Sequence, residues 1–378
     1  MQQTARKYMA RQNRKFTPRQ RTNRPLGSPL TSNLPPAQPL APPVFVDGNW
    51  HILPPLSSRL YQKSAIGLMK SDESIQVSTE EILFCHWHRH VPLPSESWFE
   101  EAVQSDPDVI AKCILFDTAR SGGELLIPAQ NIPPKWEVDI PSSTWALRWN
   151  REQVFSKVPP VAHVRWAWTT QEIDWMEMVE WTSWVHGQGM MAEFYVIDEE
   201  MDVTMYLLSQ AQPKGEQTLW PSLTNSMHRS LSLLWERRIP RGAGWYIPDA
   251  EDWPWDSIGV EHLSGRHLRH EEGMLLDTYL AGSKLDPSLH LFSDLVNRGV
   301  LLRPGFKYGS RWRVYDTPVS VAHAPWLIQP YVNAPQTWEA ACLAVRLSEG
   351  VHKMWLCAMP YGEGWFYLHM QRWLPGRT

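Results

Sequence analysis

The sequence has 378 residues, 43% of them hydrophobic, and a formal net charge of −4. This length predicts two or more domains, each with a core of its own. No apolar run is long enough to cross a bilayer, and the four cysteines form no C-x-x-C pair. These features argue against a membrane protein and against a disulfide-rich secreted protein. We expect a soluble, cytoplasmic protein with reduced, buried cysteines.

Residues 1–43 have the composition of a disordered tail. Residues 1–24 hold eight basic side chains and no acidic one, and residues 25–43 are rich in proline. A flexible cationic arm attracts RNA phosphates without sequence preference. The same composition also fits an organelle-targeting presequence or a solubilising tail, so these alternatives stay open.

Residues 44–138 are expected to form an N-terminal subdomain of mixed structure, followed by a second domain at 139–215. Within the subdomain, residues 106–128 have an apolar stripe, a helix stop at Arg-Ser-Gly and then an apolar strand. Three histidines alternate at His86, His88 and His90, and they would share one face of a strand but not of a helix. They have no convincing fourth ligand, so we predict no metal site.

Residues 216–298 are expected to hold a linker and a second N-terminal subdomain. The stretch from Pro213 to Trp255 is rich in proline, glycine and tryptophan and is interpreted as a linker. Its one expected helix lies near Met227–Trp235. Two further helical segments are predicted at His262–Glu272 and Met274–Ala281.

Residues 299–378 are expected to form the last domain, with the order strand, turn, strand, helix and two-stranded hairpin. Tyr315 follows the alternating run Arg311–Val314, so it lies at a strand end. His323 comes eight residues later, at the head of an apolar run. Lys353 ends the helix that Thr337 caps. Strand ends and a helix end can converge on one cleft.

Several motifs in this region resemble the catalytic domain of the archaeal tRNA-splicing endonuclease family. They are R-G-x5-G-F-K-Y-G (Arg298–Gly309), the W-R-V-Y-D run, V-A-H (Val321–His323) and R-L-x3-V-x-K (Arg346–Lys353) followed by Y-L-H-M. No single motif is specific. Their order and spacing over about eighty residues make the resemblance strong.

The resemblance implies that Tyr315, His323 and Lys353 cleave RNA without a metal or other cofactor. Tyr315 would take the proton of a 2′-hydroxyl, His323 would protonate the departing 5′-oxygen, and Lys353 would stabilise the charge of the phosphorane. The products would be 2′,3′-cyclic phosphate and 5′-hydroxyl ends. Tyr308 is the rival for the base, but its flanking glycines favour a tight turn.

An internal similarity between the two halves predicts an α/β (α+β) fold built as a tandem repeat of two units. Each unit would have an N-terminal helical or mixed subdomain and a C-terminal βαβ-type nuclease domain with a mixed sheet. V-P-P-V-A-H at 158–163 resembles P-V-S-V-A-H at 318–323, which pairs His163 with His323. The same comparison places Gly187 at the position of Lys353 and favours Trp149 at that of Tyr315. We therefore expect a catalytically silent first unit.

The resemblance also implies RNA-binding and assembly residues. Arg346, two helical turns before Lys353, would stack on an extruded base, with Arg372 or Trp373 on its other side. An acidic hairpin would dock on a neighbouring unit in a homodimer; its residues are Asp198, Glu199, Glu200 and Asp202. A solvated turn is an equally good interpretation of that hairpin.

Together these features predict a homodimeric enzyme that acts on precursor tRNA at the two bulges flanking an intron. One alternative is a non-catalytic RNA-binding or scaffold subunit of such an endonuclease. A metal-dependent nuclease would need paired acidic residues and a lysine on adjacent strands, and the sequence contains no such set. No membrane association is expected.

Overall fold

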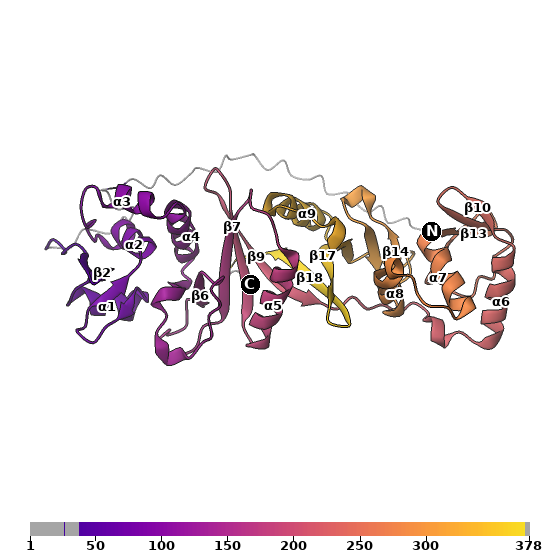
Figure 1. Ribbon diagram of the computed structural model, residues 1–378, viewed down its shortest axis with the longest axis horizontal. Helices are drawn as coiled ribbons and strands as arrows, with labels where there is room; N and C mark the ends of the chain where they lie inside the picture. The colour runs from indigo at the N-terminus through magenta and orange to yellow at the C-terminus, as the bar shows by residue number, and fades with distance from the viewer. Residues whose placement is uncertain (1–25, 27–37, 375–378) are drawn as a thin grey trace, which may run out of the picture.

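A computed structural model of the chain describes Leu26 and residues 38–374. The basic cluster at 1–24 and most of the proline-rich stretch lie outside the described residues. Figure 1 shows an elongated chain with a small sheet near each end and a large mixed sheet between them. The fold is thus mixed α/β, as the sequence predicts. Within the described part of the chain, no helix combines the length and apolar character that a membrane span needs.

The large sheet has ten strands in the order β14-β15-β16-β17-β18-β9-β8-β7-β6-β5. Its neighbours are antiparallel except for the pairs β7–β8 and β16–β17, which are parallel. A parallel pair requires a crossover connection, and these two are helices α5 (Trp175–Gly187) and α9 (Trp338–Gly350). The strands are β5 (Leu125–Pro128), β6 (Ala146–Trp149), β7 (Ala162–Trp168), β8 (Met191–Ile197), β9 (Val203–Ala211), β14 (Leu301–Pro304), β15 (Trp312–Tyr315), β16 (Trp326–Pro330), β17 (Met354–Tyr361) and β18 (Gly364–Arg372).

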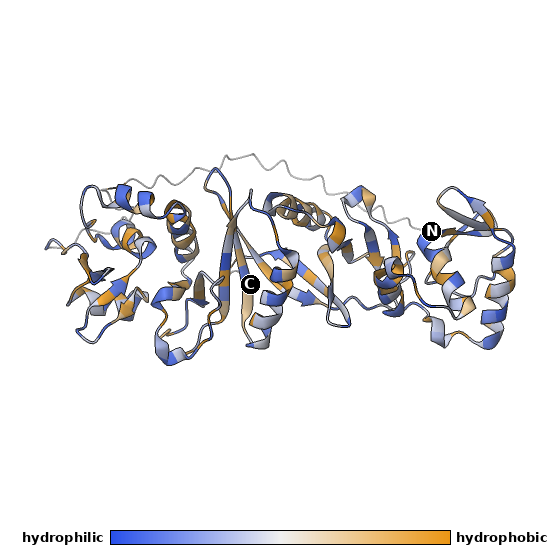
Figure 2. Cartoon of the chain, in the orientation of Figure 1, coloured by the Kyte–Doolittle hydropathy of each residue, from blue (hydrophilic) through white to orange (hydrophobic). Residues whose placement is uncertain are grey.

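The central strands are covered on both faces. Strand β8 is almost continuously apolar, and every residue after Met191 is buried. Such runs are typical of strands that are covered by helices on one side and by further structure on the other. Figure 2 shows orange, hydrophobic segments among blue and pale ones along the strands of the large sheet.

The two halves of the large sheet meet at β9 and β18. These strands pair antiparallel from Tyr367 opposite Ala211 to Arg372 opposite Tyr206. The helices reinforce the junction, because the ring of Trp338 in α9 stacks on that of Phe194 in β8, with centroids 3.8 Å apart. The first and second halves therefore share one hydrophobic core at this junction.

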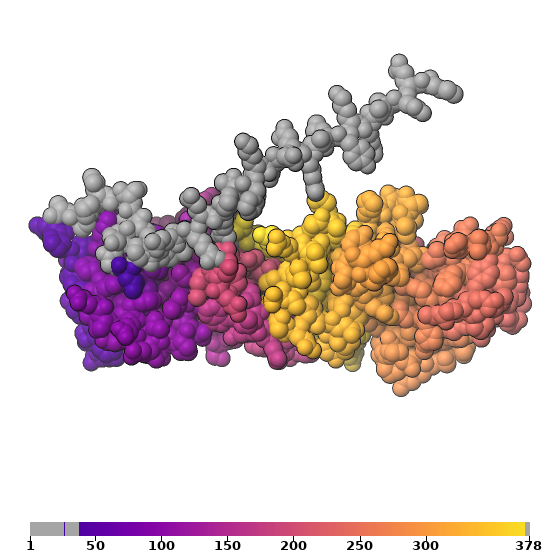
Figure 3. Space-filling model, turned by 90° about the horizontal axis from the view of Figure 1, so that it is seen from above, coloured from indigo at the N-terminus to yellow at the C-terminus, as the bar shows by residue number. Residues whose placement is uncertain are grey.

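A four-stranded antiparallel sheet lies toward each end of the molecule (Figure 1). Figure 3 shows the two parts of the chain that hold these sheets, indigo to purple and salmon to orange, at opposite ends. One has the order β1-β2-β4-β3 and the other β10-β11-β13-β12, so the two share a strand pattern. The elements of the first end are β1 (Val44–Val46), β2 (Asn49–Ile52), α1 (Leu56–Ser64), β3 (Leu68–Met69), β4 (Ile75–Val77), α2 (Thr79–Arg89), α3 (Trp98–Ser105) and α4 (Val109–Ser121). Those of the other end are α6 (Asn225–Glu236), β10 (Ile239–Arg241), β11 (Gly244–Ile247), β12 (Val260–His262), β13 (Gly265–Arg269), α7 (His270–Ala281) and α8 (His290–Asn297).

Three details differ from the sequence-based expectations. Residues 262–269 form the β12–β13 hairpin instead of a helix, because Leu263 and Ser264 both adopt positive φ at its turn. The range 213–255, interpreted as a linker, contains strands β10 and β11 in addition to α6, which agrees with the helix expected near Met227–Trp235. Strand β5 lies at the edge of the large sheet although it falls within the range 44–138 assigned to the first subdomain.

The first five and last five strands of the large sheet have the same order and relative directions. Leu125 pairs with Trp149 as Leu301 pairs with Tyr315, so Trp149 corresponds to Tyr315. Met190 directly precedes β8 as Lys353 directly precedes β17. The residue at the position of Lys353 is therefore Met190 and not Gly187.

The pairing of His163 with His323 is also shifted. His163 lies within β7, and its register with β6 and β8 makes it the counterpart of Leu327 in β16. His323 lies in the loop before β16. The shared letters V-A-H mislead the alignment because strand pairing, and not a three-residue identity, sets the register.

The alternating histidines of the first half lie on helix α2 or at its end. His86 contacts the Val91 carbonyl oxygen, 2.9 Å from its Nδ1, and His88 pairs with Asp117. His90 forms the left-handed C-cap. In the described ranges, 26 and 38–374, no three His, Cys, Asp or Glu side chains are grouped so as to hold a metal ion.

Candidate active site

Tyr315, His323 and Lys353 come from three neighbouring strand ends of the last domain. Tyr315 ends β15, is 6% exposed and packs with Leu301 and Ala324. His323 directly precedes Ala324 and is exposed. Lys353 donates a hydrogen bond from Nζ to the carbonyl oxygen of Ala324, 2.6 Å away. Ala324 thus shares an apolar cluster with Tyr315, accepts the hydrogen bond of Lys353 and directly follows His323 in the chain.

The strand registers hold these positions at one end of the sheet. Val314 lies opposite Trp326, and Trp326 lies opposite Met354. Tyr315 follows Val314, and Lys353 precedes Met354. One strand, β16, therefore separates Tyr315 from Lys353. Neighbouring strands are about 4.8 Å apart, which places their Cα atoms at about 10 Å from each other.

The local fold of α9 explains where Lys353 lies. The Thr337 hydroxyl accepts a hydrogen bond from the Ala340 N–H and caps the helix, while Ala341 and Val345 are buried. The helix ends at Gly350, so Lys353 does not end it, as the sequence suggested, but lies three residues beyond it and directly precedes β17. Burial lowers the pKa of Lys353, and the nearby positive charge of Arg313 lowers it further.

Arg313 is a side chain at this site to which the sequence analysis gave no role. It precedes Tyr315 by two residues on β15, so both side chains lie on the same face of the strand. Its guanidinium carbon is 6.0 Å from the ring centroid of Tyr315 and 5.9 Å from that of Tyr308. Its Nε donates to the Pro304 carbonyl oxygen at 3.0 Å. The alternation of W-R-V-Y is the signal that could have identified it.

Arg346 and Arg372 line one cavity of about 770 Å³, and the acidic hairpin of the first half lines the same cavity. Tyr206, Glu339 and Cys342 also contribute to its wall. The structure therefore brings two of the predicted RNA-binding arginines next to the predicted assembly residues of the same chain. The acidic residues on this wall are Asp198, Glu199, Glu200 and Asp202.

Trp373 has a different environment from Arg346. It lines a neighbouring cavity of about 810 Å³, to which Arg372 also contributes. The Trp373 indole nitrogen donates to Glu193 Oε1 at 3.2 Å, and the Arg372 N–H donates to Glu349 at 2.9 Å. Arg372 and Trp373 are the two residues expected to lie across an RNA base from Arg346. Arg372 lines the same cavity as Arg346, whereas the indole N–H of Trp373 points to Glu193.

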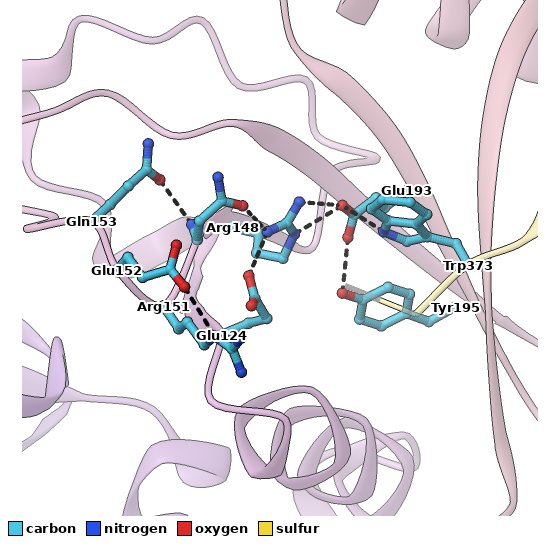
Figure 4. A network of polar contacts seen from close by, with 9 residues as sticks. Glu124, Arg148, Arg151, Glu152, Gln153, Glu193, Tyr195 and Trp373 are labelled. Atoms are coloured by element: carbon cyan, nitrogen blue, oxygen red, sulfur yellow. Dashed lines mark hydrogen bonds and ion pairs between the residues drawn. The ribbon is translucent and has the colours of Figure 1, made fainter. Parts of the chain in front are cut away.

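Glu193 belongs to a buried network of charges (Figure 4). Arg148 lies between two carboxylates, with its terminal nitrogens 2.7 Å from Glu124 and 2.7 Å from Glu193. The Tyr195 hydroxyl donates to Glu193 at 3.1 Å. Burial raises the pKa of Glu193, and Arg148 opposes that change. Trp373, which directly follows β18, is thus hydrogen-bonded to a buried carboxylate of the first half.

The family described as tRNA intron endonuclease, catalytic C-terminal domain, matches residues 285–365. This range contains Tyr315, His323, Lys353 and Arg346. The similarity to the tRNA intron endonuclease family covers residues 285–365 of this chain. The family domain thus comprises α8, strands β14 to β17, α9 and the start of β18.

Curated proteins that are similar to this chain are named tRNA-splicing endonuclease. That of Methanococcoides burtonii is 26% identical over 205 residues, which are 47% of this chain and 57% of the relative. That of Methanosarcina mazei is 27% identical over 216 residues, covering 50% of this chain and 59% of the relative. That of Thermoplasma volcanium is 26% identical over 164 residues, covering 42% of this chain and 48% of the relative. The chain thus matches about half the length of these relatives.

Proposed function

We propose that this protein is a tRNA-splicing endonuclease that cleaves precursor tRNA at the intron boundaries. The observation that carries the proposal is the coincidence of the family domain with the cluster around Ala324. Tyr315 packs against this residue and Lys353 bonds to its carbonyl oxygen, while His323 is its neighbour in the chain. The same cluster favours Tyr315 over Tyr308 as the catalytic tyrosine.

Cleavage would proceed by transesterification within the RNA. Tyr315 accepts the proton of the 2′-hydroxyl, whose oxygen attacks the adjacent phosphorus. Lys353 stabilises the negative charge that gathers on the phosphorane oxygens, and His323 donates a proton to the departing 5′-oxygen. The products are a 2′,3′-cyclic phosphate and a 5′-hydroxyl. Three side chains thus supply both proton transfers and the charge stabilisation, so the proposed mechanism needs no metal ion.

The proposed architecture is a fused pair of units, at 44–215 and 216–378, that assembles as a homodimer. Support comes from the corresponding strand order of the two halves and from the replacement of Tyr315 and Lys353 by Trp149 and Met190 in the first. The acidic hairpin at 198–202 and the arginines Arg346 and Arg372 are proposed assembly and RNA-binding groups. Two active sites held apart by two inactive units suit a substrate with two scissile bonds.

The test is incubation of the full-length protein with a bulge-helix-bulge RNA in excess EDTA, followed by analysis of the product ends. We expect two cuts, 2′,3′-cyclic phosphate ends and an undiminished rate. Loss of cleavage in EDTA that returns with Mg²⁺ contradicts the metal-independent mechanism. Tight binding without cleavage under any condition favours a non-catalytic subunit instead.

A further inference from the structure

We propose that Arg313 is a fourth catalytic residue, which binds a non-bridging oxygen of the scissile phosphate opposite Lys353. The inference rests on the proposed function and extends it. It begins with the position of Arg313 on β15, where its guanidinium lies beside the Tyr315 ring. Lys353 approaches the same place from the start of β17.

The bonding of Arg313 differs from that of the arginines around it. Arg298 pairs with Asp294, Arg303 with Glu272 and Arg311 with Glu271. Arg313 donates a hydrogen bond from its Nε to the carbonyl oxygen of Pro304. In the part of the chain that the structure describes, no carboxylate pairs with its two terminal nitrogens.

Two tyrosine rings lie near the guanidinium of Arg313 and limit where it can go. The centroids of Tyr308 and Tyr315 lie 5.9 and 6.0 Å from its Cζ, within the range of a cation–π contact. With its Nε bonded to Pro304, the planar group is held before a ligand arrives. A held guanidinium loses little conformational entropy when its remaining N–H groups bind an anion.

A phosphate is the ligand that this arrangement fits. Arg313 and Lys353 are both cations, and the charge of Arg313 is one cause of the lowered pKa of Lys353. An anion between two such cations relieves their repulsion. The terminal nitrogens of arginine form a fork that matches phosphate oxygens. As the 2′-oxygen attacks, charge grows on both non-bridging oxygens, so that Lys353 can stabilise one and Arg313 the other.

The test compares Arg313→Gln with Arg313→Lys and with the control Arg311→Gln in the full-length protein. Arg311 lies two residues earlier and is paired with Glu271. Single-turnover cleavage of the bulge-helix-bulge RNA should fall about 100-fold in Arg313→Gln, as for the loss of one transition-state donor. Arg313→Lys should recover part of this loss, and Arg311→Gln should cleave nearly as wild type. Binding of a 2′-deoxy RNA that cannot be cleaved should change little.

Phosphorothioate substrates separate a contact with phosphate from a structural role. Replacing one non-bridging oxygen by sulfur should slow the wild type, and in Arg313→Gln this effect should shrink for only one of the two diastereomers. The inference is contradicted if the sulfur effect shrinks equally for both diastereomers in Arg313→Gln, or if this variant cleaves as fast as the wild type. If the wild type itself fails to cleave, the proposed function is wrong and the inference falls with it. Cleavage by wild type and Arg313→Gln at equal rates overturns the inference alone.

Discussion

The indole nitrogen of Trp373 donates a hydrogen bond to Glu193, which lies 180 residues earlier in the chain. This contact links the end of β18, in the last domain, to the buried charges of the first half. Arg372, which lines the cavity shared with Arg346, directly precedes Trp373. The first half therefore helps to fix the position of a proposed RNA-binding arginine, even though it has Trp149 and Met190 at the positions of Tyr315 and Lys353.

The buried network that holds Glu193 should be sensitive to loss of its one cation. Arg148→Met would leave Glu124 and Glu193 buried without their shared partner, and we expect a loss of about 3–5 kcal/mol in the free energy of unfolding. Urea titration followed by circular dichroism measures this loss. The matched control is Arg151→Met, because Arg151 pairs with Glu152 at the surface, where an ion pair contributes about 1 kcal/mol or less. Equal effects of the two substitutions would refute the importance of the network.

His163 predicts a pH dependence of stability. Burial lowers its pKa from 6.5 to about 4, so the folded protein keeps the ring neutral while an unfolded chain takes up a proton. The unfolded state therefore binds more protons between these values, and stability falls as the pH is lowered, by about 1.4 kcal/mol per pH unit. The contribution is complete above pH 6.5 and is lost as the pH falls through about 4.

The substitution His163→Gln isolates this contribution. Between pH 7 and pH 5 the wild type should lose about 2 kcal/mol more unfolding free energy than the variant. Cleavage at pH 7 should be unchanged in the variant, because His163 lies within β7 of the first half. Parallel loss of stability in both proteins would contradict the pH prediction, and a large fall in cleavage rate would contradict a structural role for His163.

The sequence was informative wherever a feature depends on residues near one another in the chain. Alternation at Arg311–Val314 placed Tyr315 at a strand end, and Thr337 with the apolar stripe of Ala341 and Val345 placed the capped helix α9. Both features follow from local geometry, which periodicity and capping report directly. The histidines of α2 illustrate the limit, because their spacing alone fits a strand or a helix.

Features that depend on distant pairing could not be predicted in the same way. The bond from Trp373 to Glu193 requires β9 and β18 to pair across the junction of the halves. The correct counterpart of Lys353, Met190, follows from strand register. It is hidden because Val-His occurs both at 185–186, before Gly187, and at 351–352, before Lys353. The role inferred for Arg313 needs the positions of Tyr308 and Lys353, which lie on separate elements.

Lys353 should be essential for cleavage but not for binding. Lys353→Ala removes the cation that is proposed to face the phosphate, and the single-turnover rate should fall by about 10²–10³-fold. Binding of the 2′-deoxy RNA, measured by filter retention, should stay close to that of the wild type. Lys307→Ala is the control, since Lys307 is an exposed lysine of the same domain. A loss of binding as large as the loss of cleavage would assign Lys353 to affinity instead of transition-state stabilisation.

The acidic hairpin should control assembly through its charge. Changing Asp198, Glu199, Glu200 and Asp202 to lysine would place positive charge beside Arg346 and Arg372, with which the hairpin lines a cavity. In the proposed homodimer the hairpin docks on a neighbouring unit, where the reversed charges would replace attraction by repulsion, so we expect the proposed homodimer to dissociate. Light scattering measures the mass of the particle in solution.

The control for this charge reversal is Glu363→Lys, at the turn of the corresponding hairpin between β17 and β18. Glu363 is exposed, and this hairpin contacts the first half through Tyr361, whose hydroxyl lies 3.2 Å from Ser183 Oγ. The control tests whether any added positive charge at a hairpin tip dissociates the dimer. Dissociation of the 198–202 variant alone, with the Glu363→Lys protein still dimeric, assigns assembly to the acidic hairpin. An unchanged mass of the 198–202 variant would show that its charges act only within one chain, beside the arginines that they already face.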